Sequence, residues 1–195
     1  MLRERVDADY LEAHFGLDKD DVVVLKNGKL DDGLDSDLEE FKQFCLWAIS
    51  ANMANPLNYE KFCETVDVQS FIDYMSIETY INNSDWQSTG VNNWQAWRSK
   101  TVHSNIPEAN GKWRFVLYDT DICAGLYNSE KNVANYDSLG KNGPKSQYYN
   151  FSAILKNLIR NNEFRQQFYD SYMEIIDTTF DTTTVSSKIT EYVNS

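Results

Sequence analysis

The pattern of apolar and polar residues predicts a strand near the start of the chain. The run DVVVLKNGKL is apolar at its centre, ends as a strand at Lys26 and then turns at an Asn-Gly pair. A short helix is expected before it in VDADYLEAHFGL, with Asp7 or Asp9 as its cap and Gly16 at its end. The first residues, MLRER, are then the tail of an earlier strand.

From Ser36 to about Asn82 the apolar residues recur with helical spacing. The first helix of this block opens with Ser36 and has Glu39 three residues later, which is the pattern of a capping box. Pro56 interrupts the pattern, and two further helices are expected in NYEKFCETV and DVQSFIDYMSIETYINN. These segments predict a helical body with a broad buried face.

Two strand-like runs, NNWQAWRS and KWRFVLYD, are joined by a polar loop and predict a small antiparallel hairpin from about Asn92 to Asp119. A long surface loop rich in glycine, asparagine and serine is expected next. The last third of the chain has the pattern of two or three helices. The predicted fold class is therefore α+β, with a mostly helical body that carries one hairpin.

Composition places the chain among globular proteins. It has 195 residues, of which 42% are hydrophobic and 14% aromatic, enough for one sizeable core. A formal net charge of -12 repels phosphate backbones and anionic lipid, so we expect neither nucleic acid nor a membrane surface as the main partner. No apolar run is long enough to span a bilayer. Cys45, Cys63 and Cys123 are expected to be buried thiols.

Two aspartates stand at the end of the second strand of the hairpin. Residues two apart on a strand face the same side, so Asp119 and Asp121 would lie about 7 Å apart if the strand continued through them. Two carboxylates that close repel each other, and a divalent cation with a preference for hard oxygen ligands stabilises both, which favours Mg²⁺ or Mn²⁺. The alternative is that this DTD segment only caps a turn.

The loop that leads into the hairpin supplies further polar groups. Asp85 follows the long helix, and Asn92 and Asn93 come at the start of the next strand. An Asp after a helix, then an Asn, then a strand pair that ends in a metal-binding Asp is the order of a kinase catalytic segment. Taken singly, the two asparagines are also ordinary turn residues.

These segments resemble those of the spore coat protein H (CotH) kinase family. The resemblance rests on FIDYMSIETYINNSDWQSTGVNNWQAWR and GKWRFVLYDTDICAG, and it extends to MLRERVDADYLEAHFGL and LIRNNEFRQQFYDSYMEII. It implies an atypical protein-kinase-like fold and Mg²⁺-dependent (or Mn²⁺-dependent) transfer of phosphate from ATP to serine or threonine of a protein. The residues implied by position are Asp85 as catalytic base, Asn93 or Asn92 with Asp119 and Asp121 as metal ligands, Lys26 as the nucleotide-contacting lysine and Glu4 as its partner.

The resemblance also implies a division of the chain. Residues 1–35 are expected to be the remnant of an N-terminal lobe, and residues 36–195 a helical C-terminal lobe with the catalytic loop and the metal-binding strand end. Family members have further strands before this point, with a glycine-containing hairpin over the phosphates, so we expect the chain to be truncated at its start. The family suggests a spore coat, cell-surface or secreted location, with any export signal before Met1.

Two other functions remain open from the sequence. One is a non-catalytic module for coat assembly or the cell surface that keeps a kinase-like fold. The other is a calcium-stabilised carbohydrate-binding domain with Trp86, Trp94 and Trp97 as its sugar platform. If the chain is a kinase, its acidic surface favours a basic, serine-rich protein substrate. The oligomeric state is not indicated.

Overall fold

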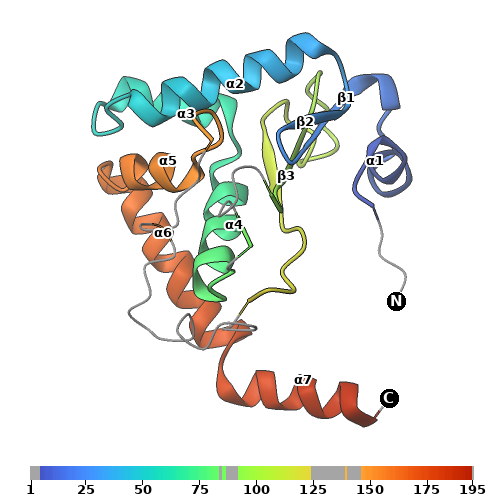
Figure 1. Cartoon of the computed structure of the whole chain (residues 1–195), viewed down its shortest axis with the longest axis vertical. Helices are drawn as coiled ribbons and strands as arrows, with labels where there is room; N and C mark the ends of the chain where they lie inside the picture. The colour runs from blue at the N-terminus through green and yellow to red at the C-terminus, as the bar shows by residue number, and fades with distance from the viewer. Residues whose placement is uncertain (1–4, 84, 87–91, 124–138, 140–145, 195) are drawn as a thin grey trace.

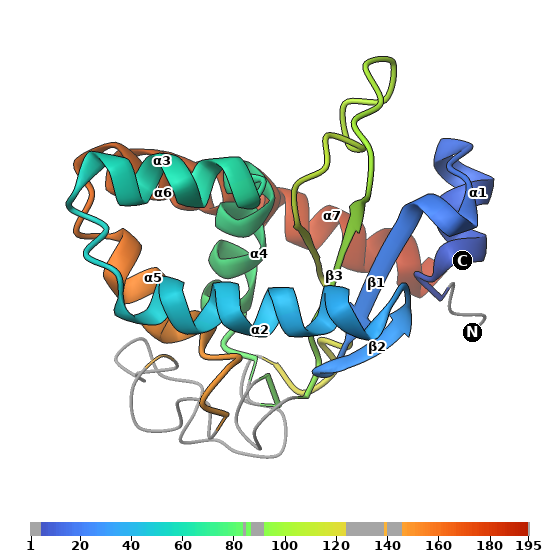
Figure 2. The ribbon, with the colours of Figure 1, turned by 90° about the horizontal axis from the view of Figure 1, so that it is seen from above.

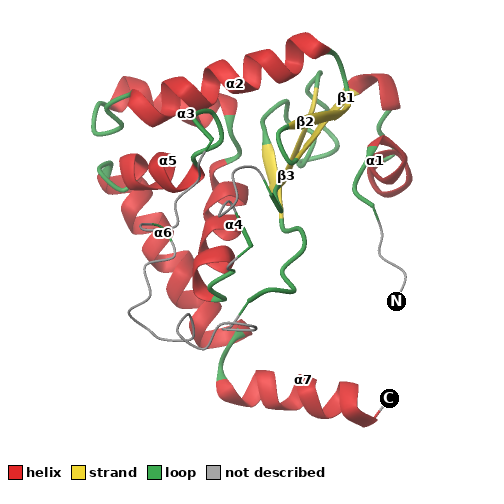
Figure 3. Ribbon diagram, in the orientation of Figure 1, coloured by secondary structure: helices red, strands yellow, loops and turns green. Residues whose placement is uncertain are grey.

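The computed structural model describes residues 5–83, 85–86, 92–123, 139 and 146–194, which form helices around one antiparallel sheet (Figures 1 and 3). The helices are α1 (Ala8–Phe15), α2 (Asp35–Ser50), α3 (Pro56–Thr65), α4 (Val68–Tyr80), α5 (Phe151–Leu158), α6 (Asn162–Glu174) and α7 (Thr182–Asn194). A 3₁₀ turn (Lys19–Asp21) and a π-helical turn (Ile175–Thr179) also occur. The strands are β1 (Val22–Lys26), β2 (Lys29–Asp32), β3 (Gln95–Ser99) and β4 (Arg114–Val116).

The sheet has the order β2-β1-β3-β4, and each neighbouring pair is antiparallel. In this register Lys26 lies opposite Gln95, and Gln95 lies opposite Val116. The end of β1, the start of β3 and the end of β4 therefore meet at one end of the sheet. That end positions the candidate site.

The two faces of the sheet bury different cores, because successive residues of a strand point to opposite sides. Helix α1 covers one face, and α3 to α6 lie on the other side of the sheet (Figures 1 and 2). The larger core is aromatic: the Phe41 ring centroid lies 4.6 Å from that of Trp113 and 5.9 Å from that of Trp94. The strand residues in the small α1 cluster are Val22, Val24, Trp97 and Val116, and those in the large core are Val23, Leu25, Leu30, Ala96 and Phe115.

Most of the predicted elements are confirmed. Helix α1 begins after Asp7, whose side chain accepts a hydrogen bond from Tyr10 N–H, and it ends at Gly16 with φ of 69°. Strand β1 ends at Lys26, and the helical block appears as α2, α3 and α4, with Pro56 in the first turn of α3. The predicted hairpin is β3 and β4, and β3 also pairs with β1 along its length, so the hairpin belongs to a larger sheet.

The predicted capping box at Ser36 is wrong. Helix α2 begins one residue earlier, at Asp35, and its N-cap is Leu34. The Asp37 carboxylate accepts the Leu34 N–H at 2.9 Å, so the reciprocal half of the cap comes from Asp37 and not from Glu39. Asp37 also pairs with Arg98 of β3 at 3.2 Å, which ties the start of the helix to the sheet.

Two further expectations concern cysteines and membranes. All three cysteines are free thiols; Cys45 is buried, while Cys63 and Cys123 are half-buried. Burial raises the pKa of each thiol, which keeps it protonated and unreactive. Within the described residues no helix combines the length and the apolar character that a membrane span requires.

Candidate functional site

Strand ends and loops converge where β1 ends and β3 begins. Asn27 N–H donates to the Trp94 carbonyl at 3.0 Å, and Trp94 N–H donates to the Asn27 side chain at 3.3 Å. The Lys26 ammonium lies 4.3 Å from the centroid of the Tyr118 ring. Lys26 therefore lies beside the segment that carries Asp119, where the sequence predicted a phosphate-contacting lysine. Its predicted partner, Glu4, lies outside the described residues.

Asp85 and Asn93 are in direct contact. The Asn93 side-chain amide donates to Asp85 Oδ2 at 2.9 Å, and Asn93 is only 8% exposed. The neighbouring Trp86 is also buried, and its indole N–H donates to the Tyr74 hydroxyl of α4 at 2.5 Å. The acid and the amide that the sequence singled out are thus brought together, and the loop that carries them is fixed to α4.

The chain leaves α4 through a Schellman motif, a left-handed helix end with two reversed backbone hydrogen bonds. Asn82 has a φ of 50° and donates its N–H to the Thr79 carbonyl at 3.3 Å, and Asn83 donates to the Glu78 carbonyl at 3.2 Å. This turn directs Asn83 back over the helix end. Its side chain then accepts the Asp85 N–H at 3.1 Å, which shapes the start of the Asp85 loop.

Backbone strain is concentrated at this end of the sheet. The left-handed region favours glycine, because a side chain there clashes with the backbone. Among the described residues, four other than glycine adopt it, and all belong to the segments that meet here: Asn27 (52°), Asn82 (50°), Asn93 (56°) and Asp119 (55°). A tight turn explains Asn27, and the helix end explains Asn82. Such conformations at Asn93 and Asp119 are typical of functional sites.

The predicted continuation of the strand through Asp119 and Asp121 is wrong. Strand β4 ends at Val116, and the left-handed φ of Asp119 breaks the two-residue alternation from which a shared face was predicted. Asp119 is half-buried and Asp121 is exposed. Their expected role as metal ligands stays a prediction, because it no longer follows from strand geometry.

The oxygen atoms at this end of the sheet suit one mode of magnesium binding. Within the described ranges no group of three or more His, Cys, Asp or Glu side chains is arranged to hold a metal ion. Mg²⁺, however, is usually bound through one or two carboxylates with water and substrate phosphate. The Asp85 carboxylate, the Asn93 amide and the Asp119 segment offer hard oxygens of that kind in one place. They fit an ion shared with a phosphate better than an all-protein cage.

Glu78 is a polar residue of the site that the sequence analysis missed. It lies on α4 with no exposed surface, and within the described residues neither carboxylate oxygen has a hydrogen bond of good geometry. Burial raises its pKa to about 8, and the Asn83 side chain lowers it by a smaller amount. A signal was present, because Glu78 stands three residues after Met75 and seven after Phe71, on the buried stripe of the helix.

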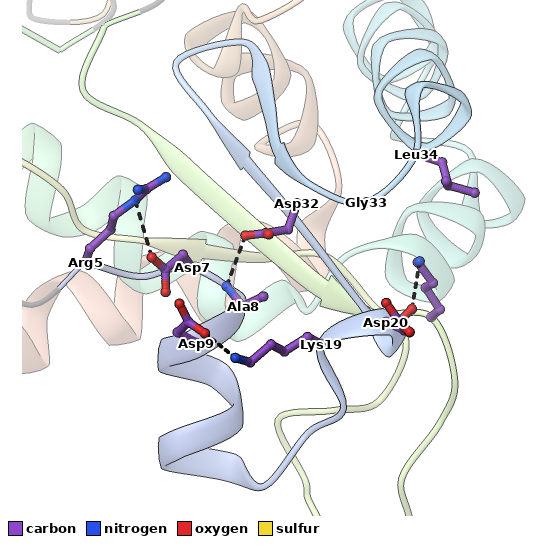
Figure 4. Close-up of a pocket in the computed structure, with 10 residues that line it drawn as sticks. Arg5, Asp7, Ala8, Asp9, Lys19, Asp20, Asp32, Gly33 and Leu34 are labelled. Atoms are coloured by element: carbon purple, nitrogen blue, oxygen red, sulfur yellow. Dashed lines mark hydrogen bonds and ion pairs between the residues drawn. The ribbon is translucent and has the colours of Figure 1, made fainter.

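A cavity of about 400 Å³ lies elsewhere, beside α1 and the end of β2 (Figure 4). Its charged groups already have partners: Arg5 pairs with Asp7, Lys19 pairs with Asp9, and the Lys100 ammonium donates to the Asp20 carbonyl at 2.8 Å. Its lining residues are Arg5, Asp7, Ala8, Asp9, Lys19, Asp20, Asp32, Gly33, Leu34 and Lys100. None of the predicted site residues that the structure describes lines it, so we do not place the active site there.

The fold and the site define an α+β protein with a polar candidate active site at one end of its sheet. The family model described as CotH kinase protein matches residues 1–195, the whole chain. The chain therefore belongs to the CotH kinase family, and at the level of the family it is a kinase-type enzyme. No curated protein and no solved structure gives a significant match. The α+β class is confirmed, whereas the kinase-like arrangement stays a prediction.

Proposed function

We propose that the chain is a magnesium-dependent protein kinase domain that transfers the γ-phosphate of ATP to a serine or threonine hydroxyl of a protein. The observation that carries this proposal is the contact between Asp85 and Asn93, at the sheet end that also holds Lys26 and the Asp119 segment. Family membership supports phosphoryl transfer as the reaction class. The acidic chain, with its net charge of -12, favours a basic substrate segment.

Each residue has one role in this proposal. Asp85 accepts the proton of the substrate hydroxyl while the hydroxyl oxygen bonds to the γ-phosphorus, the bond from that phosphorus to its bridging oxygen breaks, and ADP leaves. Asn93, Asp119 and Asp121 would hold Mg²⁺, which supplies charge neutralisation for the phosphates when bound. Lys26 binds phosphate oxygens.

The contacts of these side chains support the assignments. Asn93 donates to one carboxylate oxygen of Asp85, which orients the carboxylate for the role of proton acceptor. The Tyr118 ring holds the Lys26 ammonium beside the Asp119 segment by a cation–π interaction. The flexible four-carbon stem of a lysine lets its ammonium reach a phosphate from there.

Two substitutions and one control test the proposal. Calorimetry should detect ATP binding that requires Mg²⁺, and phosphate transfer should be measured with a basic, serine-rich peptide. Asp85→Asn should keep nucleotide binding and lower the transfer rate by about 10³-fold or more, because it removes the proton acceptor. Asp121→Ala should abolish Mg²⁺-dependent binding. Asp177→Asn, at an exposed position after α6, should change neither.

The outcomes separate an enzyme from a scaffold. If the complete domain, with any strands that precede residue 1, binds no ATP at millimolar Mg²⁺, the kinase proposal is wrong and a non-catalytic coat-assembly or cell-surface module takes its place. If ATP binds but Asp85→Asn transfers phosphate at the wild-type rate, the nucleotide site stands and the assigned base is wrong.

A further inference from the structure

Asn83 joins three parts of the candidate site. Its backbone N–H donates to the Glu78 carbonyl at 3.2 Å, at the end of α4. Its side-chain oxygen accepts the Asp85 N–H at 3.1 Å, and its side-chain amide donates to the Asp119 carbonyl in a long hydrogen bond of 3.5 Å. Asn83 is 4% exposed, so these bonds are shielded from water.

An asparagine suits this place because it can accept and donate at the same time. Its oxygen serves the Asp85 segment, and its NH₂ group serves the Asp119 segment. An apolar side chain of similar size would leave the Asp85 N–H and the Asp119 carbonyl without these partners, and unpaired polar groups in a buried setting are destabilising. The two hydrogen bonds therefore require an amide side chain at this position, and an apolar side chain of the same volume cannot replace it.

Glu78 lies behind this amide. Its carboxyl group has no exposed surface; burial raises its pKa, and the nearby Asn83 side chain lowers it by a smaller amount as a hydrogen-bond donor. Asn83 is also the residue whose N–H closes the helix end on the Glu78 carbonyl. The side chain and the backbone of Asn83 are thus both held from the α4 side.

We propose that Asn83 is a positioning residue for phosphoryl transfer, whose side chain fixes the base segment at Asp85 relative to the nucleotide segment at Asp119. The two segments that it joins are distant in sequence, since Asn83 and Asp119 are 36 residues apart. The proposal rests on the function proposed above. A displacement of about 1 Å between reacting groups lowers a rate by about 100-fold. Loss of the side chain that holds the two segments together should therefore lower the rate of phosphate transfer.

Two substitutions separate the contributions of the two side-chain hydrogen bonds of Asn83. Asn83→Ser keeps an acceptor for the Asp85 N–H but is too short to reach the Asp119 carbonyl, and Asn83→Ala removes both bonds. We expect kcat to fall about tenfold in Asn83→Ser and about 100-fold in Asn83→Ala, with KM for ATP within about twofold of wild type, because the residue positions groups and does not bind nucleotide.

A matched control exists at the start of α3. Asn55 accepts the Leu57 N–H at 3.1 Å, the same bond between residues two apart that Asn83 makes to Asp85. Asn55→Ala should lower thermal stability without changing kcat. A loss of kcat in this control equal to that in Asn83→Ala would make the effect a general consequence of destabilisation and would overturn the proposal.

Hydrogen exchange provides a readout that needs no activity. The exchange rate of the Asp85 backbone N–H, measured by NMR, should rise about tenfold in Asn83→Ala, should rise less in Asn83→Ser and should be unchanged in Asn55→Ala, since opening energies follow local hydrogen bonds. If wild type transfers no phosphate, the proposed function fails, and this exchange pattern alone decides whether Asn83 holds the loop. An Asp85 N–H that exchanges at the wild-type rate in Asn83→Ala would overturn the proposal.

Discussion

The two ends of the sheet arrange their polar residues differently. At the end where β1 begins, Asp21 collects the neighbouring loop: its carboxylate accepts the Thr101 N–H at 3.1 Å and the Thr101 hydroxyl at 2.9 Å, and it pairs with His103 Nε2 at 2.6 Å. We call these three residues the Asp21 latch. Every member pairs directly with another, and the left-handed position near this end is a glycine, Gly111 with φ of 78°.

The end of the sheet where β1 finishes is built differently. Its left-handed positions beyond the Asn-Gly turn carry side chains, in Asn82, Asn93 and Asp119. A buried carboxyl group, that of Glu78, has no hydrogen bond of good geometry in the part of the chain that the structure describes. A fold built for stability alone has no reason to keep these features, because glycine relieves the first and an apolar residue relieves the second. This difference is what we expect between a structural end of the sheet and the proposed functional end.

The largest effect should come from Glu78, in the pH dependence of folding. Its pKa is about 8 in the folded protein, raised by burial from 4.5, so the folded state binds the proton more tightly than the unfolded state. Stability therefore falls as pH rises from about 4.5 and levels off near 8, with a change of about 2 to 3 kcal/mol between pH 5 and pH 7. Glu78→Gln should remove this part of the dependence, as measured by urea unfolding at each pH.

The matched control for Glu78 is Glu64→Gln, at an exposed position on α3. It should leave the pH dependence of the wild-type protein unchanged. A Glu78→Gln protein with the same pH dependence as wild type would show that the Glu78 carboxyl group titrates normally. The contrast between the two ends of the sheet would then lose its strongest evidence.

The two lysines at opposite ends of the sheet provide the next test. Lys26 lies at the functional end, over Tyr118, and Lys100 lies at the latch end, where it donates to the Asp20 carbonyl. Methionine keeps most of the stem and removes the charge. Lys26→Met should weaken Mg²⁺-dependent ATP binding about tenfold, a loss of about 1.4 kcal/mol, because one contact to phosphate is lost. Lys100→Met should bind ATP as wild type does in calorimetry, and equal losses in both would contradict the assignment of Lys26.

The Asp21 latch should behave as a purely structural feature. Burial raises the pKa of Asp21, but hydrogen bonds from His103 and Thr101 outweigh it, so the folded value is lowered. The stabilisation is therefore present above the unfolded pKa, near 3.8, and is lost as pH falls through the lower folded value. Asp21→Asn should lower the free energy of unfolding at pH 6 by about 1 kcal/mol. The difference from wild type should shrink toward pH 3, and a change in ATP affinity would show that the latch is not only structural.

Local signals in the sequence predicted much of the fold. The cap at Asp7, the end of β1 at Lys26 and the hairpin of β3 and β4 each depend on residues close in sequence, and the structure confirms them. The order of residues along the chain placed Asp85 in one site with Asn93 or Asn92, and the direct contact between Asp85 and Asn93 is a finding of the structure. The α2 cap failed because the Asp37 carboxylate serves the backbone at Leu34 and also Arg98, which is 61 residues away.

Tertiary contacts account for what the sequence did not predict. The strand pattern of KWRFVLYD continues to Asp119, but the strand stops at Val116, and Asp119 turns into the left-handed region where Asn83 reaches its carbonyl. Periodicity places Glu78 on the buried stripe of α4, but it cannot show that other segments remove the carboxyl group from water. The contacts that bury both residues come from other segments of the chain.

The smallest effect should come from Asn82, and it tests whether the left-handed helix end places the Asp85 loop. Glycine adopts a φ of 50° without strain, whereas alanine at this position is disfavoured by about 1 kcal/mol. Asn82→Gly should therefore unfold within about 0.5 kcal/mol of wild type, and Asn82→Ala should be destabilised by about 1 kcal/mol, in urea unfolding.

The site should respond in the same order. Asn82→Gly keeps the turn that carries Asn83 back over Glu78, so the slow exchange of the Asp85 N–H should be retained, whereas Asn82→Ala should accelerate it. Gly16→Ala provides the comparison at the end of α1, where φ is 69° and an added Cβ meets no atom within 4 Å, so only the backbone is strained. That change should destabilise the protein to a similar extent and leave the Asp85 N–H unaffected. Equal exchange at Asp85 in Asn82→Gly and Asn82→Ala would mean that the loop is held by Asn83 and Trp86 alone, without help from the helix end.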